Sequence, residues 1–279
     1  MMYESTGNLR KFLEELRVNG KSQLSNRYAA QHFERYQKTI EYIDVFDKEK
    51  AIKILDLGAS FVFCYLLSSK VTGEFFGTSP EAPKFSEHGS GESKEASIKI
   101  EYQDDQLICK IRNNINLEID ALPYESEMFD LVCCNDIIEH LIYSPTKMLG
   151  ETFRVLKKNG FLCLTTDNVN NLLKVARVLL NKQTYFRLYK HSIYGRHNRE
   201  YLKHELEDLL TGIGFNLIKS TYFNYNPFRY TTDSKYRLGY DFLYCFSHLP
   251  FLRKRKKHMF VLAQRGEKLN WYYPNWLYG

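Results

Sequence analysis

Short apolar runs that end in polar residues alternate along the chain with segments of helical periodicity. The runs that predict buried strands are 52–57, 72–77, 129–134 and 161–166. Near-continuous apolar runs of this length are typical of strands covered on both faces. Helices are predicted near 61–70 and in a segment that ends near 157–160 at an Asn-Gly turn. The alternation predicts an α/β fold with a doubly wound, mainly parallel Rossmann-like sheet.

Two segments add to this core. Aromatic and aliphatic residues between 33 and 43 recur at helical spacing, so residues 1–50 are predicted to form an N-terminal helical cap that could cover a cofactor. Residues 98–112 hold two short alternating runs on either side of a polar turn and predict an inserted hairpin. The stretch 79–97 is rich in Gly, Ser, Pro and Glu, and is predicted to be an exposed loop.

Composition favours one principal domain whose buried cysteines are reduced. The 279 residues are 44% hydrophobic, which is enough for a sizeable core. The six cysteines lie mostly in apolar runs and lack the Cys-x-x-Cys spacing of a zinc site, so we expect buried, reduced thiols. No apolar stretch reaches the ~20 residues of a membrane span, and the N-terminus lacks the apolar core of a signal peptide. We therefore expect a cytoplasmic protein.

Charge and aromatic residues gather towards the C-terminus. The net charge is +6, and the run 253–258 concentrates much of it before the apolar residues 259–263. Two interpretations stay open: a solvated loop that enters a last strand, or a patch for an anionic partner such as a phosphorylated substrate, nucleic acid or a membrane surface. The tail 266–279 holds both tryptophans, so it is expected to pack on the body or on another subunit of a homo-oligomer.

Three ordered segments carry a family resemblance. Ile52-Lys-Ile-Leu-Asp-Leu-Gly58 is followed by Phe129-Asp-Leu-Val-Cys-Cys-Asn-Asp136 and then by Thr165-Thr-Asp-Asn168. In this order they resemble the class I S-adenosylmethionine-dependent methyltransferases. The resemblance implies a methyltransferase domain over 51–265, with S-adenosylmethionine as its cofactor.

The resemblance also implies where the cofactor binds. The carboxylate at the end of the first strand and the glycine after it would hold the methionine part, and an acidic residue after the third strand would meet the adenine. The further glycines of the family are replaced by Ser60 and Val62, and the acidic residue expected after the second strand is replaced within Gly77-Thr78-Ser79. The ribose is then left to Thr78, Ser79 or Glu81 as a hydroxyl or carboxylate partner. The cofactor site implied in this way consists of Asp56, Gly58, Ser60, Thr78, Asp120, Ala121 and Asn135.

The fourth strand ends at a second set of polar residues. Asp136, Glu139 and His140 are spaced i, i+3, i+4, so a helix that begins there would place all three on one face, towards the cleft. In one interpretation His140 is a general base, Glu139 fixes its tautomer, and His197 also belongs to the catalytic set. In the other, the three residues and His197 bind a divalent metal. Ubiquinone-pathway and small-RNA O-methyltransferases carry a similar Glu-x-x-Glu-His pattern.

The segment 181–215 is predicted to lie on the substrate side. Its run Gly195-Arg-His-Asn-Arg-Glu-Tyr201 resembles bacterial methyltransferases associated with polysaccharide and capsule synthesis. Arg196 and Arg199 could capture a phosphate or carboxylate bidentately, or form an ion pair with Glu200 or a nearby carboxylate. The predicted substrate-binding residues are Tyr143, Arg196, Arg199 and Tyr201.

These features predict an S-adenosylmethionine-dependent O-methyltransferase. Its acceptor would be a sugar-derived, phosphorylated or nucleotide-linked precursor of a surface polysaccharide or capsule, that is, a small and anionic molecule. One alternative is an RNA methyltransferase, supported by the basic run, although nucleic acid is the less favoured partner. Another is a catalytically silent binding module with the same fold, suggested by the replaced glycines and the missing ribose carboxylate.

Overall fold

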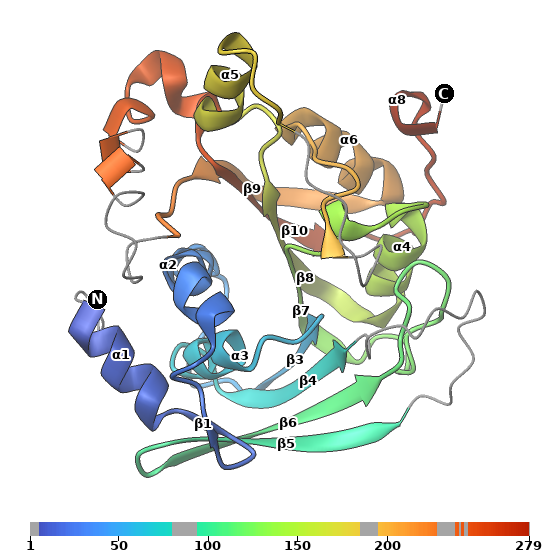
Figure 1. The fold of residues 1–279 in the computed structure, drawn as a ribbon. Helices are drawn as coiled ribbons and strands as arrows, with labels where there is room; N and C mark the ends of the chain where they lie inside the picture. Colours follow the sequence, from blue (N-terminus) through green and yellow to red (C-terminus); the bar gives the residue numbers. More distant parts are fainter. Residues whose placement is uncertain are drawn as a thin grey trace.

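The computed structural model describes residues 6–79, 94–184, 195–227, 238–239, 241–242 and 245–278. The strands within these ranges are β1 (Arg17–Val18), β2 (Lys21–Ser22), β3 (Ile52–Leu57), β4 (Gly73–Ser79), β5 (Glu95–Tyr102), β6 (Asp105–Asn113), β7 (Phe129–Asn135), β8 (Leu156–Asp167), β9 (Phe215–Phe223) and β10 (His258–Arg265). They form one sheet in the order β2-β1-β5-β6-β4-β3-β7-β8-β10-β9 (Figure 1).

The centre of the sheet is parallel. β6, β4, β3, β7 and β8 pair in parallel with one another in this order, whereas β5 is antiparallel to β6, and β10 is antiparallel to both β8 and β9. Successive side chains of a strand point to opposite faces, and Ile54 and Leu55 accordingly pack in different apolar clusters. The predicted doubly wound, mainly parallel Rossmann-like sheet is confirmed.

Helices cover both faces of this sheet (Figure 1). α1 (Thr6–Glu15), α2 (Arg27–Tyr42) and α3 (Phe61–Ser68) share one apolar cluster with the sheet. α4 (Pro145–Val155) and α6 (Lys203–Ile213) share the other. α5 (Leu172–Leu179) has no buried residue, and the short elements are η1 (Ile138–His140), η3 (Pro250–Arg255) and α8 (Asn275–Tyr278). The expected N-terminal helices are therefore present, and α2 packs against α3.

The predicted hairpin forms, but it is not a separate insertion. β5 and β6 pair antiparallel, and β6 also pairs in parallel with β4. The second arm of the hairpin is therefore a member of the parallel core, not an addition to it. An alternating pattern identifies a strand but does not say which neighbours it pairs with. Of the predicted loop 79–97, residues 80–93 lie outside the described residues and 95–97 belong to β5.

The helix before β8 is shorter than the Asn-Gly turn suggests. α4 ends at Val155, and residues 157–160 already belong to β8. Asn159 has φ +63° and turns the chain within that strand, next to a register shift in the pairing of β7 with β8. Asn-Gly therefore marks an irregularity of the strand and not the end of the helix.

The aromatic tail packs on the body, as predicted. The ring of Trp271 lies over Gly150 of α4 and that of Tyr272 over Gly212 of α6, where a Cβ atom would come within 2.6 Å and 2.1 Å of the rings. Trp276 Nε1 donates a hydrogen bond to Asp208 Oδ2 at 2.7 Å. The tail therefore depends on small residues that admit its rings between α4 and α6.

The cysteines and the lengths of the helices bear on two expectations from composition. All six cysteines are free thiols, of which five are buried and Cys245 is exposed. Among the described helices, none combines the length and apolar character that crossing a bilayer requires.

Candidate functional site

The turn after β3 is held by buried polar contacts. Gly58 has φ +67°, which favours glycine, and its N–H donates to Thr78 Oγ1 at 3.2 Å. Asp56 is 2% exposed, and its Oδ2 accepts from the Ser60 N–H at 2.9 Å. The Ser60 hydroxyl donates to Tyr36 Oη of α2 at 3.0 Å. The sheet thus brings four of the predicted cofactor residues together, with the N-terminal cap beside them.

Two polar atoms at this turn are buried without a hydrogen bond among the described residues. They are Asp56 Oδ1 and Asn135 Nδ2. Burial raises the pKa of Asp56 to about 7, against the Ser60 N–H and the nearby Asn135 amide, which lower it. The Asn135 amide is close enough to Asp56 to lower its pKa, so this acceptor and this donor lie beside each other at the strand ends.

The predicted adenine residues lie on the loop between β6 and β7. Asp120 is half-buried, and its Oδ2 accepts from the backbone N–H of Asn116 at 2.7 Å, whereas Ala121 is exposed. The carboxylate of Asp120 therefore shapes its own turn. Its assignment to adenine stays a prediction.

The prediction that Asp136, Glu139 and His140 share one helix face is wrong. Asp136 has φ +52°, and only the single 3₁₀ turn η1 follows before α4 begins at Pro145. Asp136 Oδ1 instead lies 2.7 Å from His258 Nε2, and its carboxylate is paired with the Arg35 guanidinium. Asp136 is thus removed from the proposed metal ligands.

A buried row of ion pairs and hydrogen bonds passes through this aspartate. It runs from Arg35 of α2 through Asp136 to His258, whose Nδ1 lies 2.9 Å from Asp167 Oδ1. Arg35 and His258 are 1% and 0% exposed. Burial lowers the pKa of His258 to about 4, and a neutral imidazole has one N–H, so the ring donates to one of the two carboxylates at a time. Although burial raises it, the His258 hydrogen bond and the Lys257 charge hold the pKa of Asp167 well below its usual range.

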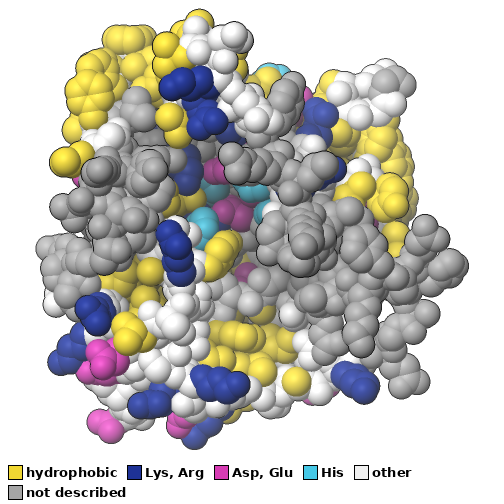
Figure 2. Space-filling model, in the orientation of Figure 1, with side chains coloured by type: hydrophobic (Ala, Val, Ile, Leu, Met, Phe, Trp, Pro, Cys, Tyr) yellow, Lys and Arg dark blue, Asp and Glu magenta, His cyan; other side chains and the backbone are white. Residues whose placement is uncertain are grey.

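Glu139, His140 and His197 converge next to this row. We name them the acceptor cluster. One ligand atom from each lies within 4.8 Å of the other two, and the histidine rings are 4.9 Å apart, edge to face. Figure 2 shows histidine and acidic side chains together at the centre of this face of the molecule. Three of the four residues predicted from the sequence as metal ligands are therefore adjacent.

Hydrogen bonds orient both imidazoles of the acceptor cluster. His140 Nδ1 lies 3.0 Å from the carbonyl oxygen of Arg196, and His197 Nδ1 lies 2.9 Å from Glu200 Oε1. Both acceptors favour the tautomer with hydrogen on Nδ1, which leaves the lone pair on Nε2. Burial lowers the pKa of His197 to about 4, so its ring is neutral at pH 7. A carbonyl or carboxylate on the second nitrogen is the usual support of a metal-binding histidine.

Glu139 supplies the carboxylate of the cluster. It is fully buried, and its Oε2 accepts from Thr166 Oγ1 at 2.8 Å. Its Oε1 is buried with no hydrogen-bond partner among the residues described. Burial and the charge of Asp167 raise the pKa of Glu139 to about 7. A cation beside Oε1 would offset this cost.

Backbone hydrogen bonds attach the substrate-side segment to η1. The N–H groups of Asn198 and Arg199 donate to the Glu139 carbonyl at 2.7 and 3.2 Å, and Asn198 Nδ2 donates to the His140 carbonyl at 2.7 Å. His197 is thereby placed against η1, 57 positions after His140. Residues 185–194 of the predicted segment lie outside the described residues.

The predicted substrate residues are divided between interior and surface. Arg199 pairs with a nearby carboxylate, as the second interpretation predicts: it donates to Glu205 Oε1 at 3.2 Å. Its guanidinium lies over the rings of Tyr201 and Trp276, at 5.4 and 5.5 Å. Tyr201 is 1% exposed and belongs to the core. Tyr143 is 74% exposed, and Arg196 Nε donates to Asn198 Oδ1 at 2.9 Å. Glu200 is paired instead with Lys174 and His197.

Sequence reasoning missed several residues that build the site. Arg35 lies within a helix, where a charged residue is usually solvated, and nothing in the pattern signals its burial. Glu118 is 6% exposed, and its Oε1 accepts from the backbone N–H groups of residues 142–144, at 2.6 to 3.1 Å. This carboxylate holds the loop between η1 and α4. Asp167 lies in the segment Thr165-Thr-Asp-Asn168 that carries the family resemblance, but the sequence analysis gave it no role in the site.

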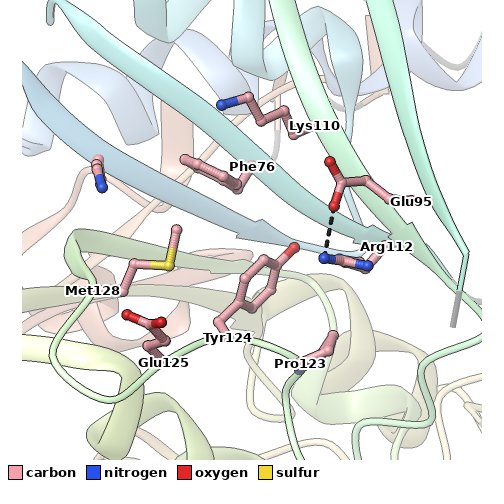
Figure 3. Close-up of a pocket in the computed structure, with 9 residues that line it drawn as sticks. Phe76, Glu95, Lys110, Arg112, Pro123, Tyr124, Glu125 and Met128 are labelled. Carbon is pink, nitrogen blue, oxygen red and sulfur yellow. Dashed lines mark ion pairs between the residues drawn. The ribbon is translucent and has the colours of Figure 1, made fainter.

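A separate pocket of about 370 Å³ lies between β4, β6 and the loop that follows β6 (Figure 3). Phe76 and Tyr124 line it, and Arg112 pairs with Glu95 at its edge at 2.6 Å. Lys110, also in the lining, pairs with Glu74 at 2.9 Å. No predicted site residue lines this pocket, and both of these cations are already neutralised.

Comparisons with known proteins concern the domain and the fold. A family model described as a methyltransferase domain matches residues 90–164. An uncharacterised protein of Methanocaldococcus jannaschii is 40% identical over 53 residues, which are 19% of this chain and 23% of that protein. The chain thus matches about a quarter of the length of this curated relative.

Two solved structures resemble the whole chain. One is a chain of the complex between the Haloferax volcanii Trm112 methyltransferase activator and a methyltransferase (TM-score 0.53, 11% identity, 87% of this chain and 95% of that chain). The other is geranyl diphosphate C-methyltransferase of Streptomyces coelicolor A3(2) with S-adenosyl-L-homocysteine (TM-score 0.50, 8% identity, 84% and 76%). At these identities the likeness establishes the fold, which is the Rossmann-like methyltransferase fold.

The fold and the domain match support a class I S-adenosylmethionine-dependent methyltransferase, with S-adenosylmethionine as the cofactor. The turn after β3 fits this molecule. Its methionine end carries an ammonium group and a carboxylate, which would provide a donor for Asp56 Oδ1 and an acceptor for Asn135 Nδ2. The polysaccharide-associated likeness has no counterpart in these comparisons.

The raised pKa of Asp56 predicts a pH-dependent stability. The folded protein holds this proton up to about pH 7, whereas the unfolded chain loses it near the ordinary value of 3.8. The stability is therefore present at low pH and lost as the pH rises from about 4 to 7. Asp56→Asn should remove this loss, and the cofactor-free variant should be more stable than the parent at pH 8 by on the order of a few kcal/mol. Urea unfolding across this pH range measures the difference, with the exposed Asp104→Asn as control; equal stability of parent and Asp56→Asn at pH 8 would contradict it.

Proposed function

We propose that this protein transfers the methyl group of S-adenosylmethionine to a hydroxyl of a sugar-derived or phosphorylated, nucleotide-linked precursor of a surface polysaccharide. The acceptor cluster is the observation that carries the proposal. Two oriented imidazoles and a buried carboxylate are suited to a divalent ion, and an alcohol needs such activation to act as a nucleophile at neutral pH.

The cofactor would be held at the turn after β3. Asp56 would bind the ammonium of its methionine part, and the Gly58 turn would let the backbone approach without an intervening side chain. S-adenosylmethionine supplies a methyl group on a sulfonium centre. As the new O–C bond forms, the C–S bond breaks and its electron pair stays on sulfur, so the acceptor must give up its hydroxyl proton.

The acceptor cluster would promote the loss of this proton through a bound ion. Nε2 of His140, Nε2 of His197 and Oε1 of Glu139 would hold the ion, with Arg196, Glu200 and Thr166 orienting these three side chains. The ion would lower the pKa of the acceptor hydroxyl, so that the proton leaves to water. Two imidazoles with one carboxylate favour Mn²⁺, Fe²⁺ or Zn²⁺ over Mg²⁺.

Arg199 is the group that would recognise an anionic acceptor. Its backbone N–H is bonded to the Glu139 carbonyl, which fixes it beside the cluster. Its side chain is 37% exposed, and the rings of Tyr201 and Trp276 restrain the guanidinium plane. A restrained guanidinium loses little entropy when it binds a phosphate or carboxylate.

Calorimetric titration with S-adenosylhomocysteine tests the cofactor end. We expect micromolar binding by the parent, and a reduction of about tenfold or more for Asp56→Asn, since the neutral amide cannot pair with the ammonium. His140→Ala should bind like the parent, because His140 is assigned to the acceptor. A folded protein that does not bind the ligand would instead support the silent binding module.

Titration of the metal-stripped protein with Mn²⁺ at pH 8 tests the acceptor end. We expect one ion per chain, and a loss of about tenfold or more in affinity for His197→Ala, because one of three protein ligands is removed. His204→Ala, an exposed histidine of α6, is the matched control. Absence of ion binding by the parent would contradict the metal assignment and leave His140 as the proton acceptor.

The acceptor class is tested by transfer of labelled methyl groups. The parent should label a panel of nucleotide-linked sugars in the presence of Mn²⁺, and a chelator should abolish the signal. Arg199→Ala should raise the KM for these acceptors with little change in kcat, since the residue is assigned to binding alone. Transfer to structured RNA in place of the sugars would overturn the proposed acceptor.

A further inference from the structure

Two segments expose large apolar side chains on one part of the surface. The end of α5 leaves Leu179 81% and Leu180 66% exposed, and in the segment before β10 Phe242 and Phe251 are 63% and 78% exposed. Isolated exposed apolar residues are common, but groups of them on a soluble fold mark interaction sites. We name as the apolar-basic face the residues Val178, Leu179, Leu180, Phe242, Phe246 and Phe251, with Arg177, Lys182, Arg253 and Lys254 beside them.

Hydrogen bonds place the two segments next to each other. Asn168 Nδ2, just before α5, donates to the carbonyl oxygens of Lys254 and Lys256 at 3.0 and 2.8 Å, and Arg255 Nη1 donates to the Asn170 carbonyl at 3.5 Å. Figure 1 shows α5 beside the segment that leads into β10, and Figure 2 shows apolar and basic side chains together in that region. The face is therefore one surface built from two distant parts of the chain.

The charge on this surface is of one sign. Residues 168–184 contain three Lys or Arg and no acid, and residues 238–257 contain five Lys or Arg and the single acid Asp241. These segments thus carry a net +7 by sequence, compared with +6 for the whole chain. The count includes Lys174, which is paired with Glu200, and Lys257, which lies over the Tyr225 ring at 3.8 Å, so the charge that faces solvent is smaller. Asp241 is already bonded to Asn226 Nδ2 at 2.8 Å. Arg177, Lys182, Arg253 and Lys254 are exposed.

We propose that the apolar-basic face docks on the surface of an anionic lipid bilayer. Apolar side chains such as Leu179 and Phe251 would enter the interface, and the exposed Lys and Arg would meet the anionic headgroups. This combination of an apolar face with surrounding basic residues is the physical requirement for peripheral membrane binding. The charge complementarity favours a lipid surface over a second copy of this chain, whose matching face would repel it.

Docking there would bring the acceptor cluster close to the bilayer. α5 follows Asn168, which lies at the end of β8 and pairs with Tyr201, and η3 leads directly into His258. The face and the cluster therefore lie at the same end of the sheet. If the proposed function holds, an acceptor with a lipid anchor fits this arrangement; the docking itself does not depend on that function.

Vesicle co-sedimentation of the full chain tests the docking. We expect binding to phosphatidylcholine vesicles that contain phosphatidylglycerol, little binding to phosphatidylcholine alone, and release at ~0.5 M salt, where the Debye length is short. The variants Leu179→Ser with Phe251→Ser, and Arg253→Gln with Lys254→Gln, should each reduce the bound fraction about tenfold. Ile108→Ser, which changes a 42% exposed residue on β6, should bind like the parent.

The assay distinguishes membrane docking from misfolding of the variants and from self-association. Thermal melting should show that the variants are folded, because the four replaced residues are exposed. Absence of binding to the anionic vesicles, or equal binding by parent and variants, would overturn the proposal. A dimer of the parent in sedimentation velocity that Leu179→Ser with Phe251→Ser dissociates, without vesicle binding, would assign the face to a second copy instead. The assay needs neither cofactor nor turnover, so its failure is distinct from a failure of S-adenosylhomocysteine binding.

Discussion

The buried row Arg35–Asp136–His258–Asp167 is the constraint on which the site depends. These contacts connect the N-terminal cap, the end of β7, the start of β10 and the end of β8. These four segments of the polypeptide meet at the carboxyl end of the parallel strands. Removal of one member would leave a buried charge without its partner, which is strongly destabilising. Because Asp136 is held by Arg35 and His258, the chain leaves β7 in a turn and not in a helix, and Glu139 is directed towards Thr166.

The same arrangement holds two buried carboxylates, one at the proposed cofactor site and one in the acceptor cluster. Asp56 and Glu139 are both buried carboxylates whose pKa burial raises to about 7, and each keeps one oxygen without a hydrogen bond among the described residues. Such groups reduce the stability of the ligand-free protein and gain most from a cationic partner. An ammonium at Asp56 and a divalent ion at Glu139 would meet this need in different ways, one for the cofactor and one for the acceptor.

Two features of the surface around the site would recognise anionic groups. The aromatic tail restrains Arg199 beside the acceptor cluster, and the apolar-basic face presents apolar and cationic side chains at the same end of the sheet. A methyl transfer to an anionic precursor at a bilayer would use both features. The recognition of charge is then shared between one restrained guanidinium and a broad basic surface, which act at different ranges.

The sequence by itself determined the central strands of the sheet and the residues at their ends, because buried parallel strands have a distinct apolar pattern and their carboxyl ends lie together. It did not predict β1, β2 or β9. It placed β3, β4 and β7 within one residue of their observed starts, whereas β8 begins five residues earlier than predicted, at Leu156. The grouping of Asp56, Gly58, Ser60 and Thr78 came from the family resemblance. The sequence also predicted Glu139, His140 and His197 as a group, on the strength of a resemblance. Only the tertiary structure decided that Asp136 turns away to Arg35, that Arg199 pairs with Glu205 and not Glu200, and that the second arm of the hairpin joins the parallel core. These outcomes depend on contacts between residues far apart in the chain, whose charges and backbone angles no local pattern encodes.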